Sequence, residues 1–487
     1  MKKGPLLNKN TNNFTTRDSL GIEGVAASIS AELCPIVNTV TPRAFYWPFL
    51  VWNYYDFYKN SGITEHTYNT FDKQFLKRQD YFFVLSQLLI NSTDQYNLVG
   101  IQNTQIDVNN NPDGPYKYNK NYFVTSFGGM QYYNAGCITM DYIREIDVEN
   151  NKRFSFPRIT QIGKEMALYF ESVIKNTEYY KNYRMIDVPV PRSVLEEYGN
   201  VINLGMNGFD RCKESLRKRL FENERYFMLR DSAEYLKFIF DKYNMYDSKL
   251  NEYRGILFDS FSPRGRKEML PDELRSISSG WEIVIGRQYF TCGLECIWKY
   301  MLYLLSGESK TKNDWIEDSI NSSTWNCDIN SSIGDLLENC DLDFETRELM
   351  IYDAAHLRNE QYMVENGLKL ILSMYNRFVD RDDFDKESAY LSWGNDTASI
   401  SFEELILTVQ NYINRPIKDF LVFVMNRWLI EQHYNTAFEK LLQNRDGFYY
   451  EIVDGYYYHK HDFYIAFQGV RLYQLAQVMR DLDILKR

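Results

Sequence analysis

Cysteine is scarce in this sequence and follows no recognisable spacing. Seven cysteines are scattered over 487 residues, an odd number without the density of a secreted disulfide framework. They are Cys34, Cys137, Cys212, Cys292, Cys296, Cys327 and Cys340. We therefore expect reduced thiols in a cytoplasmic protein. Cys292 and Cys296 lie one helical turn apart in a very apolar segment, which favours core packing over a reactive role.

Long hydrophobic runs are also missing. The longest, from Ala44 to Trp52, is interrupted by Pro48 and is far shorter than the roughly 20 residues that a helix needs to cross a bilayer. The N-terminal MKKGPLLNKNTNN carries two lysines with no apolar stretch behind them, unlike a signal peptide. The sequence predicts a soluble protein with no membrane partner.

The common motifs of nucleotide-binding and hydrolytic enzymes are absent. A phosphate-binding P-loop needs Gly-Lys followed by Ser or Thr, but Glu165 follows Gly163 and Lys164. No G-x-G-x-x-G follows a predicted strand, and no G-x-S-x-G turn occurs. Five histidines leave little material for metal or acid–base chemistry. These absences favour a binding protein without a cofactor over an enzyme.

The sequence does contain material for several hydrophobic cores. Apolar residues make up 44% of the chain and aromatic residues 16%, and 487 residues are too many for one core. Because helical spacing of apolar residues dominates, we predict a mainly α, multi-domain helical protein with small β-hairpin modules. The predicted parts are a helical domain (1–90), a winged-helix-like α+β module (91–190), a central helical domain (191–415) and a helix-hairpin-helix module (416–487).

Local signals place several elements within these parts. Apolar spacing predicts helices over residues 20–33, 71–90 and 160–174, and a long buried helix over 280–306. Thr160 is the candidate cap of the third of these helices. Thr41 and Pro42 resemble a cap followed by a first helical residue, which predicts a helix that Pro48 kinks or restarts. Residues 122–133 are rich in β-formers around two glycines, and residues 448–459 alternate around Asp454-Gly455. We expect a hairpin in each region.

Two groups of basic residues are candidates for nucleic-acid binding. The first is crowded into one helical segment: Arg211, Lys213, Arg217, Lys218 and Arg219. The second occupies a predicted loop: Arg264, Arg266 and Lys267. Because the net charge of −11 opposes general coating of nucleic acid, any contact with phosphates requires such a local patch. The alternative is that both groups are simply solvated surface.

Carboxylates and histidines give weaker candidates. Asp147 and Glu149 with Lys152 could serve a metal-dependent nuclease, or could form a polar turn. His459 and His461 would share one face of a strand, but zinc usually needs three or four protein ligands, so a solvated hairpin edge is the alternative. We therefore predict no metal site.

The segment from Asp314 to Glu348 is strongly acidic. It holds ten acidic residues and one basic residue, Arg347. Such a segment faces solvent or a basic partner.

Segments at both ends of the chain resemble a pattern found in other proteins. Three segments near the N-terminus resemble a pattern of uncharacterised bacterial proteins from phage-defence loci. In those proteins a T-R-D-x-L-G-I opening, matched here by Thr15 to Ile22, precedes an E/D-L-x-P turn and a T-x-R-A-R-Y helix, matched by Glu32 to Pro35 and Thr41 to Phe49. Residues 432–434, 446–448 and 480–485 are similar to the ends of the same proteins. The pattern includes Arg17, Asp18 and Arg43, whereas Phe45 replaces its second arginine. Those three residues could equally cap helices and form ion pairs.

The resemblance implies a context and no catalytic residues. It suggests a companion of an SMC-type ATPase or of a separate nuclease encoded in the same operon. Our leading hypothesis is an accessory or sensor subunit of a multi-protein bacterial antiviral system that binds such a partner, with DNA as a further candidate ligand. The alternatives are a metal-dependent nuclease effector and a structural scaffold.

Overall fold

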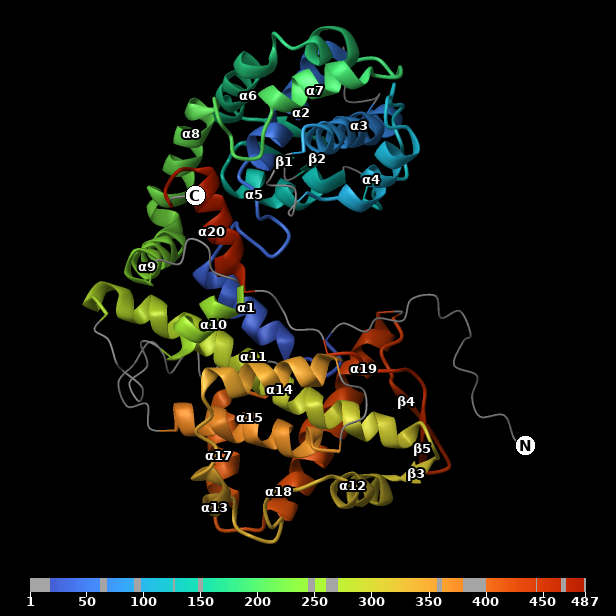
Figure 1. Ribbon diagram of the computed structural model, residues 1–487, viewed down its shortest axis with the longest axis vertical. Coiled ribbons are helices and arrows are strands. Elements are labelled where there is room, and N and C mark those ends of the chain that lie inside the picture. The colour runs from blue at the N-terminus through green and yellow to red at the C-terminus, as the bar shows by residue number, and fades with distance from the viewer. Residues whose placement is uncertain are drawn as a thin grey trace. The chain divides into compact units, whose positions relative to one another are not determined.

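A computed structural model shows a mainly helical chain, as the sequence predicted (Figure 1). It describes residues 18–61, 68–91, 98–125, 128–147, 152–243, 250–259, 270–356, 361–379, 400–443, 445–465 and 470–485. The chain forms two compact units, each built from two separate stretches of sequence. Unit 1 comprises residues 1–33 and 248–469, and unit 2 comprises residues 34–247 and 470–487. The sequence boundaries at 90, 190 and 415 fall inside these units and stay predictions of smaller subdivisions.

Unit 1 is organised around one long helix, α11 (Arg275–Leu305), which is buried on nearly every side. A helix that is apolar all round belongs at the centre of a core, so the buried helix predicted over 280–306 is confirmed. In Figure 1, α14 and α15 run alongside it. The other helices of unit 1 are α1 (Glu23–Leu33), α10 (Leu250–Asp259), η6 (Asp272–Leu274), α12 (Lys312–Asn321), α13 (Ile333–Leu337), α14 (Phe344–His356), α15 (Met363–Phe378), α17 (Phe402–Tyr412), α18 (Ile417–Phe423), the π-helical turn η7 (Val424–Glu431) and α19 (Gln432–Leu442).

Helices α11 and α15 cross at two glycines. A Cβ atom built on Gly367 would lie 2.5 Å from the carbonyl oxygen of Gly293, and one on Gly293 would lie 2.8 Å from the carbonyl oxygen of Gly367. Both contacts are with backbone, which cannot move aside without shifting a helix. The pair of glycines therefore sets how closely these two helices pack.

The C-terminal part of unit 1 contains the predicted hairpin. Strands β4 (Tyr450–Val453) and β5 (Tyr456–His459) are antiparallel and joined at Asp454-Gly455, which confirms the turn signal. A two-residue strand, β3 (Lys310–Thr311), pairs with β5, so the sheet order is β3-β5-β4. Tyr450 and Tyr457 face Trp315 of α12, at ring distances of 5.7 and 5.4 Å.

Unit 2 is built on an aromatic core between α2 (Tyr46–Ser61) and its neighbours. Phe45 stacks on Phe83 of α3 (Tyr68–Leu89) at 4.6 Å, and Trp52 stacks on Phe170 of α6 (Gln161–Ile174) at 5.3 Å. The other helices of unit 2 are α4 (Ile101–Asn110), η2 (Gly128–Tyr133), α5 (Asn134–Thr139), the π-helical turn η3 (Tyr179–Tyr183), α7 (Arg192–Val201), α8 (Asp210–Phe221), η4 (Glu224–Tyr226), α9 (Phe227–Tyr243) and α20 (Arg471–Asp481).

Two local predictions in unit 2 were wrong. Thr41 and Pro42 do not begin a helix; α2 begins at Tyr46, so Pro48 lies in its first turn, where a missing N–H costs no hydrogen bond. Residues 128–133 form the 3₁₀ helix η2 instead of a hairpin. The hairpin of this region consists of β1 (Ile143–Asp147) and β2 (Lys152–Ile159), and it leads directly into α6.

Candidate nucleic-acid interface

Helix α8 divides the first basic group between two faces. Lys213 is buried, and its Nζ lies 2.6 Å from Asp483 Oδ2. The Nε atom of Arg217 donates to the carbonyl oxygen of Leu482 at 2.7 Å. Both side chains therefore hold the C-terminal turn after α20. They are structural, and the prediction of a nucleic-acid contact is better placed on the remaining three residues.

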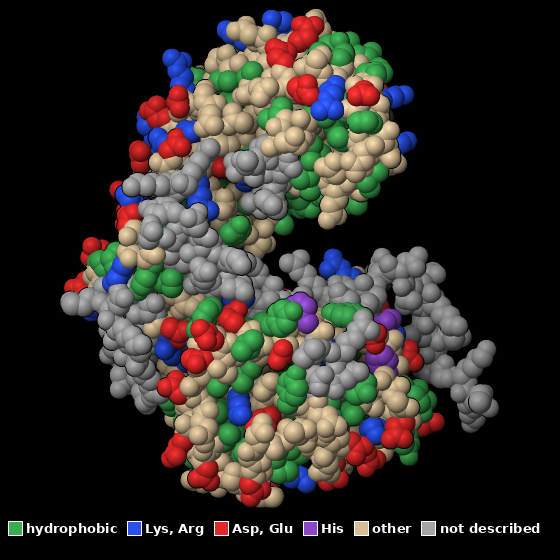
Figure 2. Space-filling view, viewed as in Figure 1, with side chains coloured by type: hydrophobic (Ala, Val, Ile, Leu, Met, Phe, Trp, Pro, Cys, Tyr) green, Lys and Arg blue, Asp and Glu red, His purple; other side chains and the backbone are tan. Residues whose placement is uncertain are grey.

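Arg211, Lys218 and Arg219 line a pocket on the opposite side of the group. Arg211, Ser215 and Arg219 follow one another at four-residue spacing, so they share one face of α8. Arg211 and Lys218 are exposed and Arg219 is half-buried. The edge of unit 2 that carries α8 displays basic and acidic side chains side by side (Figure 2).

Helix α6 forms the facing wall of this pocket. Thr160 caps the helix as predicted, because its Oγ1 accepts the N–H of Gly163 at 3.0 Å. A Cβ atom on Gly163 would lie 2.0 Å from the carbonyl oxygen of Tyr142, so this glycine brings α6 close to the preceding segment. From here α6 presents Ile162, Glu165 and Tyr169 to the pocket.

The charges in the pocket are mixed. Lys218 pairs with Glu214 at 2.7 Å, and this exposed pair holds the pKa of Glu214 below its ordinary value through hydrogen bonding and charge. The guanidinium carbon of Arg211 lies 5.5 Å from the centre of the Tyr169 ring. Within the described ranges, no ion pair occupies Arg211 or Arg219. These two arginines are therefore available to an anion.

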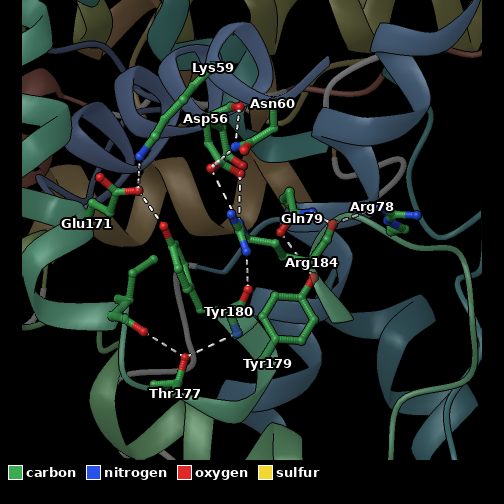
Figure 3. A network of polar contacts seen from close by, with 12 residues as sticks. Asp56, Lys59, Asn60, Arg78, Gln79, Glu171, Thr177, Tyr179, Tyr180 and Arg184 are labelled. Carbon is green, nitrogen blue, oxygen red and sulfur yellow. Dashed lines mark hydrogen bonds and ion pairs between the residues drawn. The ribbon is translucent and has the colours of Figure 1, made fainter. Parts of the chain in front are cut away.

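A second polar cluster in unit 2 is already saturated (Figure 3). It joins α2, α6 and η3: Asp56 pairs with Arg184 at 3.1 Å, and Lys59 pairs with Glu171 at 3.2 Å. The hydroxyl of Tyr180 also donates to Glu171. Burial raises the pKa of Asp56, and the neighbouring Arg184 opposes that rise. Because each of these charges has a partner, the cluster fixes α6 in unit 2 and carries no free reactive group.

The residues of the N-terminal pattern have structural contacts in unit 1. The carboxylate of Asp18 accepts the N–H groups of Ile22, Glu23 and Gly24 at 2.9 to 3.2 Å, which caps α1. The carbonyl oxygen of Leu20 accepts a hydrogen bond from Gln432 at 2.9 Å. Two segments of the resemblance, at residues 18–22 and 432–434, thus meet inside one unit.

A glycine permits this approach. Gly21 has a φ of +68°, and a Cβ atom there would lie 2.7 Å from Thr436 Oγ1. Both the left-handed backbone and the closeness to α19 favour glycine.

Arg43 makes the equivalent connection in unit 2. Its guanidinium forms two hydrogen bonds with the carboxylate of Asp481, at 3.0 and 2.8 Å, and Asp481 also accepts the N–H of Ala44 at 3.0 Å. Both side chains of the ion pair are almost fully buried. Asp18 and Arg43 therefore have structural contacts, Asp18 within unit 1 and Arg43 within unit 2.

His433 should make the stability of unit 1 depend on pH. Its Nδ1 lies 3.0 Å from the carbonyl oxygen of Ser19, and its Nε2 accepts the N–H of Tyr449 at 3.2 Å. A ring nitrogen that accepts a hydrogen bond carries no proton, so these contacts fit the neutral imidazole. Burial lowers the pKa of His433 to about 4. A histidine in the unfolded chain, with a pKa of about 6.5, binds a proton at a higher pH than folded His433 does. Stability should therefore be lost as pH falls from about 6.5 to about 4.

We expect this loss to reach about 3 kcal/mol in unit 1. The measurement is urea unfolding followed by tryptophan fluorescence at pH 7 and pH 4, for the wild type and His433→Gln. Glutamine keeps a donor and an acceptor but does not titrate, so it should reduce the pH dependence. An equal pH dependence in both proteins would contradict the assignment.

Several sequence candidates lie wholly or partly outside the described residues. Arg17 and the loop with Arg264, Arg266 and Lys267 are outside, as is Glu149 of the nuclease hypothesis. Asp147 is opposite Lys152 in the β1–β2 register. Within the described ranges, no three His, Cys, Asp or Glu side chains are placed to hold a metal ion. The nuclease alternative stays a prediction.

The acidic segment is partly used inside unit 1. Glu348 pairs with Arg254, and Asp318 pairs with Lys310 at 2.8 Å. Several other carboxylates of the segment, such as Glu338 and Asp341, are exposed. Acidic side chains are spread over the visible face of unit 1 and do not form one patch (Figure 2).

Comparison with known proteins gives no match: no family model, no curated protein and no solved structure is similar to this chain. None of the described helices is both long and apolar enough to cross a membrane.

Sequence reasoning missed half of the pocket. It found the cations of α8 but not Tyr169 and Glu165 on α6, some 40 residues earlier in the chain. The four-residue spacing of Arg211, Ser215 and Arg219 was a usable signal for a common face. Nothing in the sequence indicated that Lys213 and Arg217 have partners about 270 residues away.

Proposed function

We propose that the chain is a non-enzymatic, nucleic-acid-binding subunit, and that the α6–α8 pocket of unit 2 holds the phosphate backbone. One observation carries this proposal. Arg211 and Arg219 line one pocket from the same helix face, and neither is held by an ion pair within the described ranges, whereas Lys213 and Arg217 are held.

The spacing of the two arginines suits a chain of phosphates. Eight residues of α-helix span about 12 Å, a length that covers more than one phosphate of an extended strand. Guanidinium groups bind phosphate oxygens through paired hydrogen bonds, which a lysine ammonium cannot reproduce. With a net charge of −11, the rest of the protein opposes unspecific coating, so binding would concentrate at the pocket.

The biological setting is the accessory or sensor role in a multi-protein bacterial antiviral system. Its support is the resemblance at both ends of the chain, where Asp18 and Arg43 have structural contacts. Partner proteins of the same operon, such as an SMC-type ATPase or a nuclease, would meet unit 1, whose exposed carboxylates suit a basic partner. The β1–β2 hairpin followed by α6 would act as the winged-helix-like part of the DNA-binding unit.

Charge reversal at the pocket tests the nucleic-acid role. In the Arg211→Glu/Arg219→Glu variant we expect affinity for a labelled single-stranded DNA to fall about tenfold or more, because each charge-assisted hydrogen bond contributes roughly 1.5–3 kcal/mol. The slope of the logarithm of the binding constant against the logarithm of salt concentration is negative, and it should become shallower by about 1.4, since each lost phosphate contact on a single strand contributes about 0.7. Fluorescence anisotropy over a salt series measures both quantities.

The control changes the same charge elsewhere in unit 2. Lys117 and Lys120 are exposed and lie outside the pocket, so Lys117→Glu/Lys120→Glu should retain most of the affinity. Equal losses in both variants would show an unspecific charge effect and remove the pocket from the proposal.

A pull-down of the tagged chain from its host, with and without nuclease treatment, tests the proposed role as an accessory subunit that binds a partner protein. A partner that remains after nuclease treatment supports an accessory subunit. Recovery of the chain alone contradicts that role.

A further inference from the structure

We infer that the α6–α8 pocket takes an unpaired nucleotide, with its base stacked beside Tyr169, so that the protein prefers single strands to duplex. This inference rests on the proposed function and names the form of nucleic acid that the same site would bind. Phosphate contacts alone do not distinguish the two forms, because both present phosphates to a groove.

One wall of the α6–α8 pocket carries an aromatic ring, that of Tyr169. Tyr169 is half-buried in the pocket and belongs to α6, which the Lys59–Glu171 ion pair and the hydrogen bond from Tyr180 to Glu171 hold in unit 2. The ring is an aromatic surface at the wall of the pocket, and the guanidinium of Arg211 lies over it, 5.5 Å from the ring centre, as a second flat group on which a base can stack. Bases inside a duplex are already stacked and cannot use it.

The α6–α8 pocket also contains two carboxylates. Glu165 and Glu214 line the same pocket as the arginines. In a site for phosphates only, they would repel the ligand. Carboxylate oxygens instead accept hydrogen bonds from the amino groups of exposed base edges. Cations, one aromatic ring and carboxylates together match a nucleotide whose base has left a duplex.

The size of the pocket agrees with such a ligand. Its volume is about 550 Å³, inside the range of roughly 300–1,000 Å³ that small-molecule sites occupy. One nucleotide fits this space, whereas the bases of an intact duplex are paired inside the double helix and cannot enter the pocket to reach Tyr169.

The test compares one labelled oligonucleotide as a single strand and as a duplex, bound to the full chain. Wild type should bind the single strand more tightly. Tyr169→Ala should weaken single-strand binding by roughly five- to 150-fold, the range of one base–aromatic stack, and leave duplex binding unchanged. Tyr169→Phe keeps the ring and should behave like wild type, which separates stacking from loss of the hydroxyl.

The outcomes separate this inference from the proposed function. If Arg211→Glu/Arg219→Glu weakens binding while Tyr169→Ala leaves the single-strand affinity unchanged, the stacking inference is overturned and the phosphate site stands. If the arginine variant binds both forms as wild type does, the proposed function itself fails. Equal weakening of single strand and duplex by Tyr169→Ala also overturns the inference, since stacking requires an unpaired base.

Discussion

Replacing Arg43 by alanine should lower the free energy of unfolding of unit 2 by about 3–5 kcal/mol. Arg43 and Asp481 form a bidentate pair, and both side chains are almost completely excluded from water. The substitution removes the guanidinium from a buried carboxylate to which the N–H of Ala44 still donates. Removal of one partner is costly because the remaining buried carboxylate has lost its opposite charge, even where the pair itself adds little net stability.

Urea unfolding measures the loss, and hydrogen exchange of α2 and α20 shows that it arises in unit 2. Because the two units can unfold in separate transitions, one global fit would be misleading. The Arg43→Met/Asp481→Leu variant replaces both charges with apolar groups and should recover most of the stability.

An exposed ion pair in unit 2 provides the matched control. Lys218→Ala breaks the pair with Glu214, in which both side chains are about 60% exposed. It should lower the free energy of unfolding far less than Arg43→Ala does, because exposed ion pairs contribute little to stability. A similarly small loss in Arg43→Ala would contradict the structural role assigned to the buried pair.

Unit 2 should lose up to about 4 kcal/mol of stability as pH rises from about 4 to about 7, because of Asp80. Asp80 is fully buried and accepts hydrogen bonds from the hydroxyl of Tyr122 and the N–H of Gly129, but its Oδ1 has no hydrogen-bond partner among the described residues. Burial raises the pKa of Asp80 to about 7, partly offset by those two hydrogen bonds and by Lys77.

The sign of the effect follows from the two protonation states. Between about pH 4 and 7 the folded protein keeps a proton that an unfolded aspartate, with a pKa of about 3.9, has released. Raising the pH therefore favours unfolding. Asp80→Asn resembles the neutral acid and should reduce this dependence, so that the variant is more stable than wild type at pH 8 and similar to it at pH 4.

Hydrogen exchange of α3 over a pH series measures this effect within unit 2, while the His433 effect in unit 1 has the opposite sign. Profiles for wild type and Asp80→Asn that stay parallel from pH 4 to 8 would show that Asp80 does not hold the proton. Gly128 is unsuitable for a test here: its φ is +64°, and a Cβ atom would lie 2.2 Å from the Asp80 carboxylate.

The sequence by itself determined those features that depend on neighbours along the chain. The apolar run of α11 predicted a central helix, Asp454-Gly455 predicted the β4–β5 hairpin, and Thr160 predicted the start of α6. These signals succeed because helix periodicity, tight turns and helix caps are properties of a few consecutive residues. Where local signals failed, as for residues 128–133, tertiary packing decided between conformations that the residues allow.

Only the tertiary structure decided which charged residues are available to a ligand. The basic residues of α8 are alike in sequence, yet Lys213 is buried against Asp483 while Arg211 lies in a pocket with Tyr169. Likewise, Arg43 has its partner 438 positions away in Asp481. Solvation, ion pairing and pocket shape depend on residues brought together by folding, so these roles cannot be derived from local sequence alone.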